Sequence, residues 1–195
     1  MNSIIIVEGA QGSGKTTVSN WIRENKVYTN LYRLTGHNDN SKNGREKSIK
    51  MYDALMDYVE KLENSDINLL FDRTFITEMV YCMCGYRKYM FADKGKEYIK
   101  RLNELGRRGN FEIVIINLKV SDADKFRERF LENDRKDKPR HLSIEFNVDN
   151  SIKQQESYEI ILEHIKNTYK YIDVIDINTD KENFRDIVMD RLKDE

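Results

Sequence analysis

The chain has 195 residues, of which 34% are charged and 39% are apolar. This length suits one domain with a sizeable core, and the apolar content excludes an intrinsically disordered chain. The formal net charge is −1, so the sequence lacks the overall basic field that holds a nucleic-acid polymer by its phosphates. A small phosphorylated ligand in a locally basic cleft fits this charge better.

The cysteines and the apolar runs bear on the cellular compartment. Cys82 and Cys84 are separated by one residue, too close for an ordinary disulfide, and no partner at metal-ligand spacing completes a zinc site. No apolar run approaches the length that spans a bilayer, and residues 3–7 lack the length and basic flank of a signal peptide. We therefore expect a soluble, cytoplasmic protein with reduced cysteines and no membrane partner.

Hydrophobic patterning predicts strands that alternate with helices along the chain. The expected strands are short apolar runs at residues 3–8, 28–34, 68–72, 111–118 and 172–177. The expected helices cover residues 16–25, 46–64, 74 toward 89, 93–107, 121 to about 132, 150 to about 169, and 180–193. Strands separated by helical crossovers predict an α/β fold, with a parallel sheet covered on both faces and ligands beyond the carboxyl ends of its strands.

The strongest functional signal lies between the first predicted strand and the first predicted helix. The stretch Gly9-Ala10-Gln11-Gly12-Ser13-Gly14-Lys15-Thr16 fits the phosphate-loop pattern G-x-x-x-x-G-K-[ST] without a mismatch. Its glycines let backbone amides approach a phosphate, and the helix N-terminus that follows favours an anion. Lys15 is expected to reach the β- and γ-phosphates of ATP, and Thr16 to offer a hydroxyl to Mg²⁺. The other residues expected to bind this cofactor are Gly9, Gln11, Gly12, Ser13, Gly14 and Thr17.

A second candidate site follows the third predicted strand. Asp72 ends that strand and Arg73 comes next, at the edge of the sheet where the phosphate loop is expected. An acid in this place can hold Mg²⁺ through water, and the arginine can bind a transferred or acceptor phosphate with two parallel hydrogen bonds. We therefore expect both residues to be catalytic and Asp72 to be a metal ligand. The alternative is a surface ion pair or a helix N-cap.

Arginines gather around a break in the helical pattern at residues 133–141, which contains the only proline. Phosphoryl transfer spreads negative charge over the moving group, and a mobile cationic lid can close on it. We expect a lid at about residues 133–147 within one domain of residues 1–195, with Arg129 and Arg135 as catalytic cations. A solvated charged helix end is the alternative.

Three further residues are candidates for the acceptor pocket. His37 and Asp39 lie in the loop after the second predicted strand, and loops of this kind often carry function. Tyr52 could stack on a nucleobase, although the helical spacing of its apolar neighbours favours a place in the core.

Together these residues resemble the thymidylate kinase-like and deoxynucleoside kinase-like group of phosphate-loop kinases. The resemblance rests on Val7-Glu8-Gly9 through Thr16-Thr17, on Phe71-Asp72-Arg73-Thr74 followed by Tyr81 and Gly85-Tyr86-Arg87, and on Glu128-Arg129-Phe130. It implies a three-layer fold with a five-stranded parallel sheet and a small lid, and transfer of the γ-phosphoryl group of ATP with Mg²⁺. It also adds Glu8 and Arg87 to the residues expected to bind substrate. Some members of the group are dimers, so a homodimer is one expected assembly.

Two features depart from the group. Gln11 stands where thymidylate kinases usually carry an acid inside the loop. Residues 35–39 replace both the Arg-Glu-Pro-like element of thymidylate kinases and the glutamate base of deoxynucleoside kinases. These departures leave the identity of the acceptor open.

The leading hypothesis is ATP- and Mg²⁺-dependent phosphoryl transfer to a deoxynucleoside monophosphate. A phosphate acceptor is already a nucleophile, so it needs no dedicated catalytic base. A deoxynucleoside kinase is the alternative acceptor class, and a nucleotide-binding regulatory NTPase is the alternative of another class. The sequence lacks a guanine-reading Asn-Lys-x-Asp motif, and its near-neutral charge disfavours action on polynucleotide ends.

Overall fold

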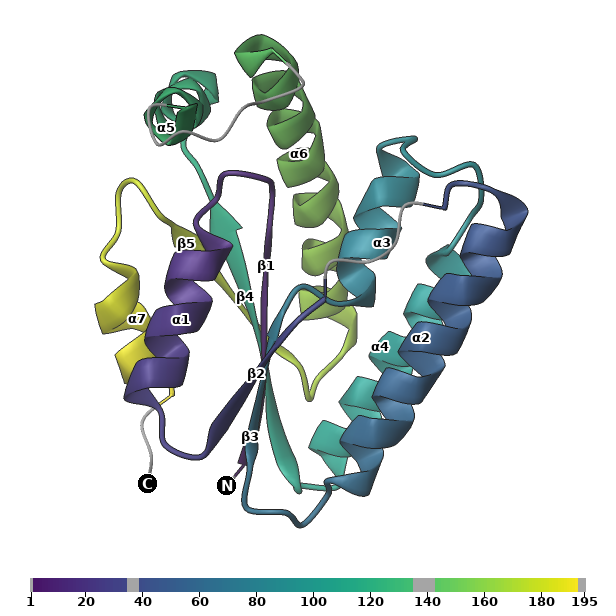
Figure 1. The fold of residues 1–195 in the computed structure, drawn as a ribbon. Helices are drawn as coiled ribbons and strands as arrows, with labels where there is room; N and C mark the ends of the chain where they lie inside the picture. Colours follow the sequence, from purple (N-terminus) through teal and green to yellow (C-terminus); the bar gives the residue numbers. More distant parts are fainter. Residues whose placement is uncertain (1, 35–38, 135–142, 193–195) are drawn as a thin grey trace.

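The computed structural model describes residues 2–34, 39–134 and 143–192, and these residues form a three-layer α/β fold (Figure 1). The strands are β1 (Asn2–Gly9), β2 (Thr29–Arg33), β3 (Asn68–Asp72), β4 (Phe111–Lys119) and β5 (Asp173–Asn178). They form one parallel sheet in the order β2-β3-β1-β4-β5. The five-stranded parallel sheet expected from the sequence is confirmed.

Helices cover both faces of the sheet. Within the described residues they are α1 (Lys15–Asn25), α2 (Lys42–Lys61), α3 (Phe75–Met83), α4 (Ala92–Arg107), α5 (Ala123–Asp134), α6 (Ile144–Thr168) and α7 (Phe184–Arg191). Figure 1 shows α1 and α7 on one face, α2, α3, α4 and α6 on the other, and α5 beyond the end of β4. None of the described helices is long and apolar enough to cross a membrane.

The central strand β1 is buried on both faces because successive side chains point to opposite sides of the sheet. Ile5 and Val7 pack into the core beneath α1 and α7, whereas Ile4 and Ile6 pack into the larger core beneath α2, α3, α4 and α6. Burying one such side chain stabilises the fold by about 1.5–3 kcal/mol. The loop that follows β1 therefore extends from a rigid platform.

Strand register brings the ends of three strands to one edge of the sheet. Asp72, the last residue of β3, is in register with Val7 of β1 and with Arg33 of β2. On the other side of β1, Val7 pairs with Ile116 of β4. Parallel strands place their carboxyl ends at the same edge, so residues from distant parts of the sequence meet beside the loop after β1.

Several helix boundaries differ from the predicted ones. The helix expected from residue 150 begins at Ile144, because the hydroxyl of Ser143 accepts a hydrogen bond from the backbone N–H of Phe146 at 3.2 Å. Similarly, α7 begins at Phe184, later than expected, because Asn183 caps its first turn. The helix predicted to continue toward residue 89 ends at Met83, just before Gly85 with a φ of 75°.

The predicted lid region, residues 133–147, overlaps two helices. Its first two residues belong to α5, and residues 144–147 form the first turn of α6. Residues 135–142 lie outside the described part of the chain.

Candidate active site

The phosphate loop joins β1 to α1 and depends on its glycines. Gly9 has a φ of 144°, and a Cβ there would lie 2.5 Å from the carbonyl oxygen of Leu118 in β4. Gly14 has a φ of 95° and forms the N-cap of α1. Both conformations favour glycine. The first amides of α1 have no partners within the helix, so they and the helix dipole form an anion-binding end.

Lys15 lies inside this loop and closes it. Its side-chain ammonium donates hydrogen bonds to the carbonyl oxygens of Gly9 at 2.8 Å and Ala10 at 2.6 Å, and the residue is 6% exposed. Burial lowers the pKa of Lys15 to about 7, with a further lowering from the positive charge of Arg73. A bound phosphate group would raise this pKa again.

Asp72 and Arg73 lie beside the loop, as their place after β3 predicts. The Asp72 carboxylate accepts a hydrogen bond from the hydroxyl of Ser19 at 3.4 Å and lies 3.6 Å from Nε of Arg33. The backbone N–H of Arg73 donates to the carbonyl oxygen of Val7 at 3.1 Å, which ties this turn to β1.

The Arg73 side chain is half-buried. Its guanidinium donates a hydrogen bond to the hydroxyl of Tyr81 on α3 at 3.0 Å. Arg73 is also close enough to lower the pKa of Lys15. The fold thus places two cations from separate segments on the same side of the phosphate loop.

The donor set around the loop fits Mg²⁺. Thr16 is exposed on the first turn of α1, and Asp72 offers a carboxylate from the neighbouring strand. The Ser19 hydroxyl lies 3.3 Å from the Thr16 carbonyl oxygen and 3.4 Å from the Asp72 carboxylate, which places the acid against α1. Among the described residues, the hydroxyl of Ser13 is fully buried without a hydrogen-bond partner. Hard oxygen ligands and an unpaired loop hydroxyl suit a magnesium–phosphate ligand.

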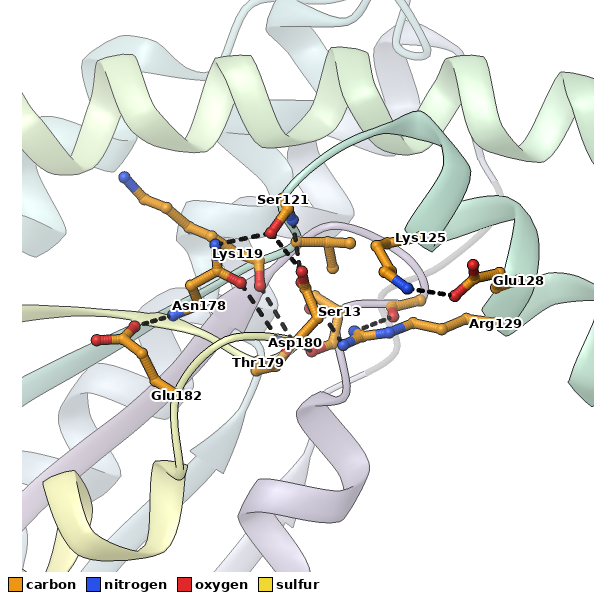
Figure 2. Close-up of polar contacts among 12 residues, drawn as sticks. Ser13, Lys119, Ser121, Lys125, Glu128, Arg129, Asn178, Thr179, Asp180 and Glu182 are labelled. Atoms are coloured by element: carbon orange, nitrogen blue, oxygen red, sulfur yellow. Dashed lines mark hydrogen bonds and ion pairs between the residues drawn. The ribbon is translucent and has the colours of Figure 1, made fainter.

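Arg129 reaches the phosphate loop from α5, as Figure 2 shows. Its Nη1 donates a hydrogen bond to the carbonyl oxygen of Gly12 at 3.0 Å, and its Nη2 lies 3.9 Å from the carboxylate of Asp180. That carboxylate in turn accepts hydrogen bonds from the backbone N–H and the hydroxyl of Ser121. The turn after β5 and the turn after β4 therefore hold Arg129 beside the loop.

Two more contacts fix the loop from outside. The hydroxyl of Thr179 donates to the carbonyl oxygen of Ser13 at 3.1 Å (Figure 2). The backbone N–H of Gln11 donates to the side-chain oxygen of Gln154 on α6 at 3.0 Å. The loop is thus held by β5 and α6 as well as by its own glycines.

Arg127, a further arginine close to the predicted lid, does not reach the phosphate loop. Arg127 is two residues before Arg129, but its guanidinium pairs with Glu145 at 2.7 Å and with Asp124 on the surface of α5 and α6. Arg135 lies outside the described residues. The expectation of a catalytic role for Arg135 stays a prediction.

Arg87 joins two segments beside the Arg73 turn. Its side chain donates to the buried carboxylate of Glu78 at 2.7 and 3.2 Å, and to the side-chain oxygen of Asn40 at 2.8 Å. Its guanidinium also lies 5.2 Å from the ring centre of Tyr81. Arg87 therefore connects α3 with the segment that precedes α2.

Three more candidate substrate residues have clear places in the fold, and His37 lies outside the described residues. Tyr52 is 2% exposed in the core, and its hydroxyl donates to the Thr74 carbonyl oxygen at 3.3 Å. Asp39 accepts a hydrogen bond from Lys47, which lowers the pKa of its carboxyl. Glu8 is fully buried beneath the Arg73 turn.

The sequence reasoning missed Arg33 and Asp180. Arg33 is the last residue of β2 and is in register with Asp72. A cation at the carboxyl end of the second predicted strand is the pattern that could have identified it. Asp180 comes two residues after the end of β5, the outer strand at the opposite edge of the sheet from β2. Its contact with Arg129 could not be found from the sequence, because the two residues belong to segments far apart in the chain.

No protein-family model matches the sequence, and no curated protein does. Solved structures do match it. A deoxyadenosine kinase from M. mycoides with bound dCTP has 18% sequence identity, coverage of 98% of each chain and a TM-score of 0.52. The same enzyme with bound dATP has 17% identity, coverage of 98% of this chain and 100% of that chain, and a TM-score of 0.53. A thymidylate kinase from Candida albicans has 11% identity, coverage of 97% and 89%, and a TM-score of 0.59. The chain therefore has the phosphate-loop kinase fold of these deoxyadenosine and thymidylate kinases, as its sequence motifs predict.

Proposed function

We propose that this protein is a kinase that transfers the γ-phosphoryl group of ATP, with Mg²⁺, to a deoxynucleoside monophosphate. One observation carries the proposal. Lys15 is buried inside the phosphate loop, and the half-buried Arg73 leaves a neighbouring turn that is bonded to β1 through Val7, so two cations from separate segments lie beside the loop. A phosphoryl group in transfer is an anion that two such cations can stabilise.

The residues around the loop have separate tasks in this reaction. The loop amides and Lys15 bind the β- and γ-phosphates, Arg73 binds the acceptor or the transferred phosphate, and Arg129 approaches from α5. Thr16 and Asp72 would hold Mg²⁺, which supplies charge neutralisation on the phosphate oxygens when it is bound. Catalysis rests on alignment and on charge stabilisation.

The state of the nearby carboxylates favours a monophosphate acceptor. Asp72 already faces Arg33 and Ser19, and Glu8 is enclosed by four hydrogen-bond donors. Neither carboxylate is placed to take a proton from a sugar hydroxyl, whereas a phosphate oxygen needs no base. A deoxynucleoside acceptor is the second candidate, because the matched M. mycoides structures are deoxyadenosine kinases.

The test is a panel of acceptors. The purified protein is incubated with ATP and Mg²⁺, and ADP release is measured with each deoxynucleoside monophosphate, each deoxynucleoside and a short oligonucleotide. Release that depends on a monophosphate supports the proposal, and release that depends only on deoxynucleosides supports the second candidate. Release that is the same without an acceptor indicates a regulatory NTPase. The absence of acceptor-dependent ADP at any concentration overturns a kinase of small acceptors.

We also propose that the protein works in the cytoplasm as a homodimer without nucleic-acid partners. Cys82 and Cys84 are both free, which suits a reducing compartment. The net charge of −1 disfavours binding to a polyanion. Sedimentation equilibrium of the purified protein tests the dimer.

A further inference from the structure

Glu8 is fully buried near the end of β1, and its carboxylate is enclosed by donors from α3 and α6. Oε1 accepts hydrogen bonds from the backbone N–H and the hydroxyl of Thr74, both at 2.7 Å. Oε2 accepts from the hydroxyls of Thr77 at 2.7 Å and Tyr158 at 3.0 Å. A buried carboxylate is costly without such partners, and four donors offset much of that cost.

These hydrogen bonds hold the turn that carries Arg73. Arg73 has a φ of 76°, a left-handed conformation that costs a non-glycine residue about 1–3 kcal/mol and needs support from its surroundings. The N–H of Arg73 donates to the carbonyl oxygen of Val7, and the next N–H, that of Thr74, donates to Glu8. Two successive residues of β1 therefore hold two successive amides of the turn. Glu8 thereby fixes the direction in which the Arg73 side chain leaves the backbone.

We propose that Glu8 is a positioning residue, which acts through its hydrogen bonds on the turn that carries Arg73. It contacts neither nucleotide, in contrast to the substrate contact expected from the sequence. The part of this inference that concerns turnover rests on the proposed kinase function. The part that concerns the conformation of the Arg73 turn does not depend on an acceptor.

Glu8→Gln tests the charge with little change of shape. The amide oxygen can still accept from Thr74, and the hydroxyls of Thr77 and Tyr158 can rotate to accept from the new amide N–H. We expect kcat with the acceptor to fall by about tenfold or more, as for other losses of preorganisation. We also expect the backbone amides of Arg73 and Thr74 to exchange with solvent faster than in the wild-type protein, because a neutral amide oxygen is a weaker acceptor than a carboxylate.

Thermal stability separates this role from a purely structural one. Burial raises the folded-state pKa of Glu8, so the stability linked to its protonation is present at low pH and lost as pH rises through that pKa. At neutral pH the charged carboxylate therefore costs stability relative to a neutral amide. Glu8→Gln should keep or raise the Tm while it lowers kcat. A large fall in Tm, together with a proportional loss of all activities, contradicts the positioning role.

Two further variants complete the design. Thr77→Val removes one donor to Oε2 and leaves the charge, so it should lower kcat by a smaller factor than Glu8→Gln does. Asn68→Ala is the matched control for lost buried hydrogen bonds, because Asn68 bonds to Ser3 and Val27 at the far end of β3. It should lower the Tm and leave both kcat and the exchange of the Arg73 and Thr74 amides unchanged.

The outcomes separate this inference from the proposed function. A Glu8→Gln protein with wild-type kcat and wild-type exchange of the Arg73 and Thr74 amides overturns the positioning role. If Glu8→Gln does not fold, an unchanged kcat in Thr77→Val overturns it. If the wild-type protein turns over no acceptor, the proposed function fails, whereas hydrogen exchange of the Arg73 and Thr74 amides still decides whether Glu8 holds the turn.

Discussion

Arg129 on α5 donates a hydrogen bond to the carbonyl oxygen of Gly12 in the phosphate loop at 3.0 Å. A bound phosphate would compete for this guanidinium, so the contact places a cation at the site before the nucleotide arrives. We expect Arg129→Ala to lower kcat by about 100-fold, within the range for lost cationic stabilisation of a phosphoryl group. Steady-state kinetics with the acceptor found in the panel measures this.

Arg127→Ala is the matched control for this prediction. Arg127 lies on the same helix, but its guanidinium pairs with Glu145 and Asp124 on the surface. Exposed ion pairs contribute little, so this variant should keep wild-type turnover. Similar losses in the two variants would assign the effect to α5 as a whole rather than to the Arg129–Gly12 contact.

Lys15→Met should abolish turnover and yet stabilise the fold at acidic pH. Folding lowers the pKa of Lys15 to about 7, so the folded protein binds the Lys15 proton less tightly than the unfolded chain does. The free energy of unfolding therefore decreases as the pH falls toward that value. The methionine removes this cost. Thermal unfolding should therefore show a gain in Tm at about pH 6 that shrinks as pH rises above about 8. A lower Tm than wild type at every pH would contradict the assignment.

Arg73→Ala should slow turnover far more than it weakens ATP binding. Arg73 follows the end of β3, and the proposed function assigns it to the acceptor or transferred phosphate, so its removal should raise the barrier with little change in the affinity for the donor. The comparison is between kcat and the dissociation constant for ATP from calorimetry. Equal losses in rate and ATP affinity would place Arg73 on the donor side.

The phosphate loop could be predicted from the sequence because its chemistry is local. Gly9, Gly14 and Lys15 act within one stretch, and each has a conformation or contact that the motif requires. The parallel sheet could be predicted as well, because apolar strands between helical segments leave few other arrangements.

The rest of the site depends on contacts between distant segments. Glu8 meets Thr74 and Tyr158 across 66 and 150 positions of the chain, and no local pattern encodes such a network. The start of α6 was predicted too late, because Ser143 caps a turn whose polar residues hide the helical spacing. The place of Tyr52, by contrast, could be predicted from a local pattern. The helical spacing of its apolar neighbours favours the core, and Tyr52 lies there.

Tyr52→Leu distinguishes a core residue from a ligand-stacking one. The ring packs 5.9 Å from that of Phe91 and 6.1 Å from that of Phe75, measured between ring centres. Loss of the ring and its hydroxyl should lower the free energy of unfolding by about 2–4 kcal/mol. Denaturant titration measures this, and the KM for the acceptor should stay within about twofold of wild type, as expected for a residue away from the ligand. A large rise in KM without loss of stability would place Tyr52 in the acceptor pocket.

The most direct test of phosphoryl transfer is identification of the product. The wild-type protein and Lys15→Met are incubated with ATP labelled in its γ-phosphate, Mg²⁺ and a deoxynucleoside monophosphate, and the products are separated by anion exchange. We predict that the wild-type protein moves the label into a deoxynucleoside diphosphate in step with ADP release, and that Lys15→Met forms none. Label found only in inorganic phosphate, at the same rate with and without the acceptor, would contradict the kinase assignment.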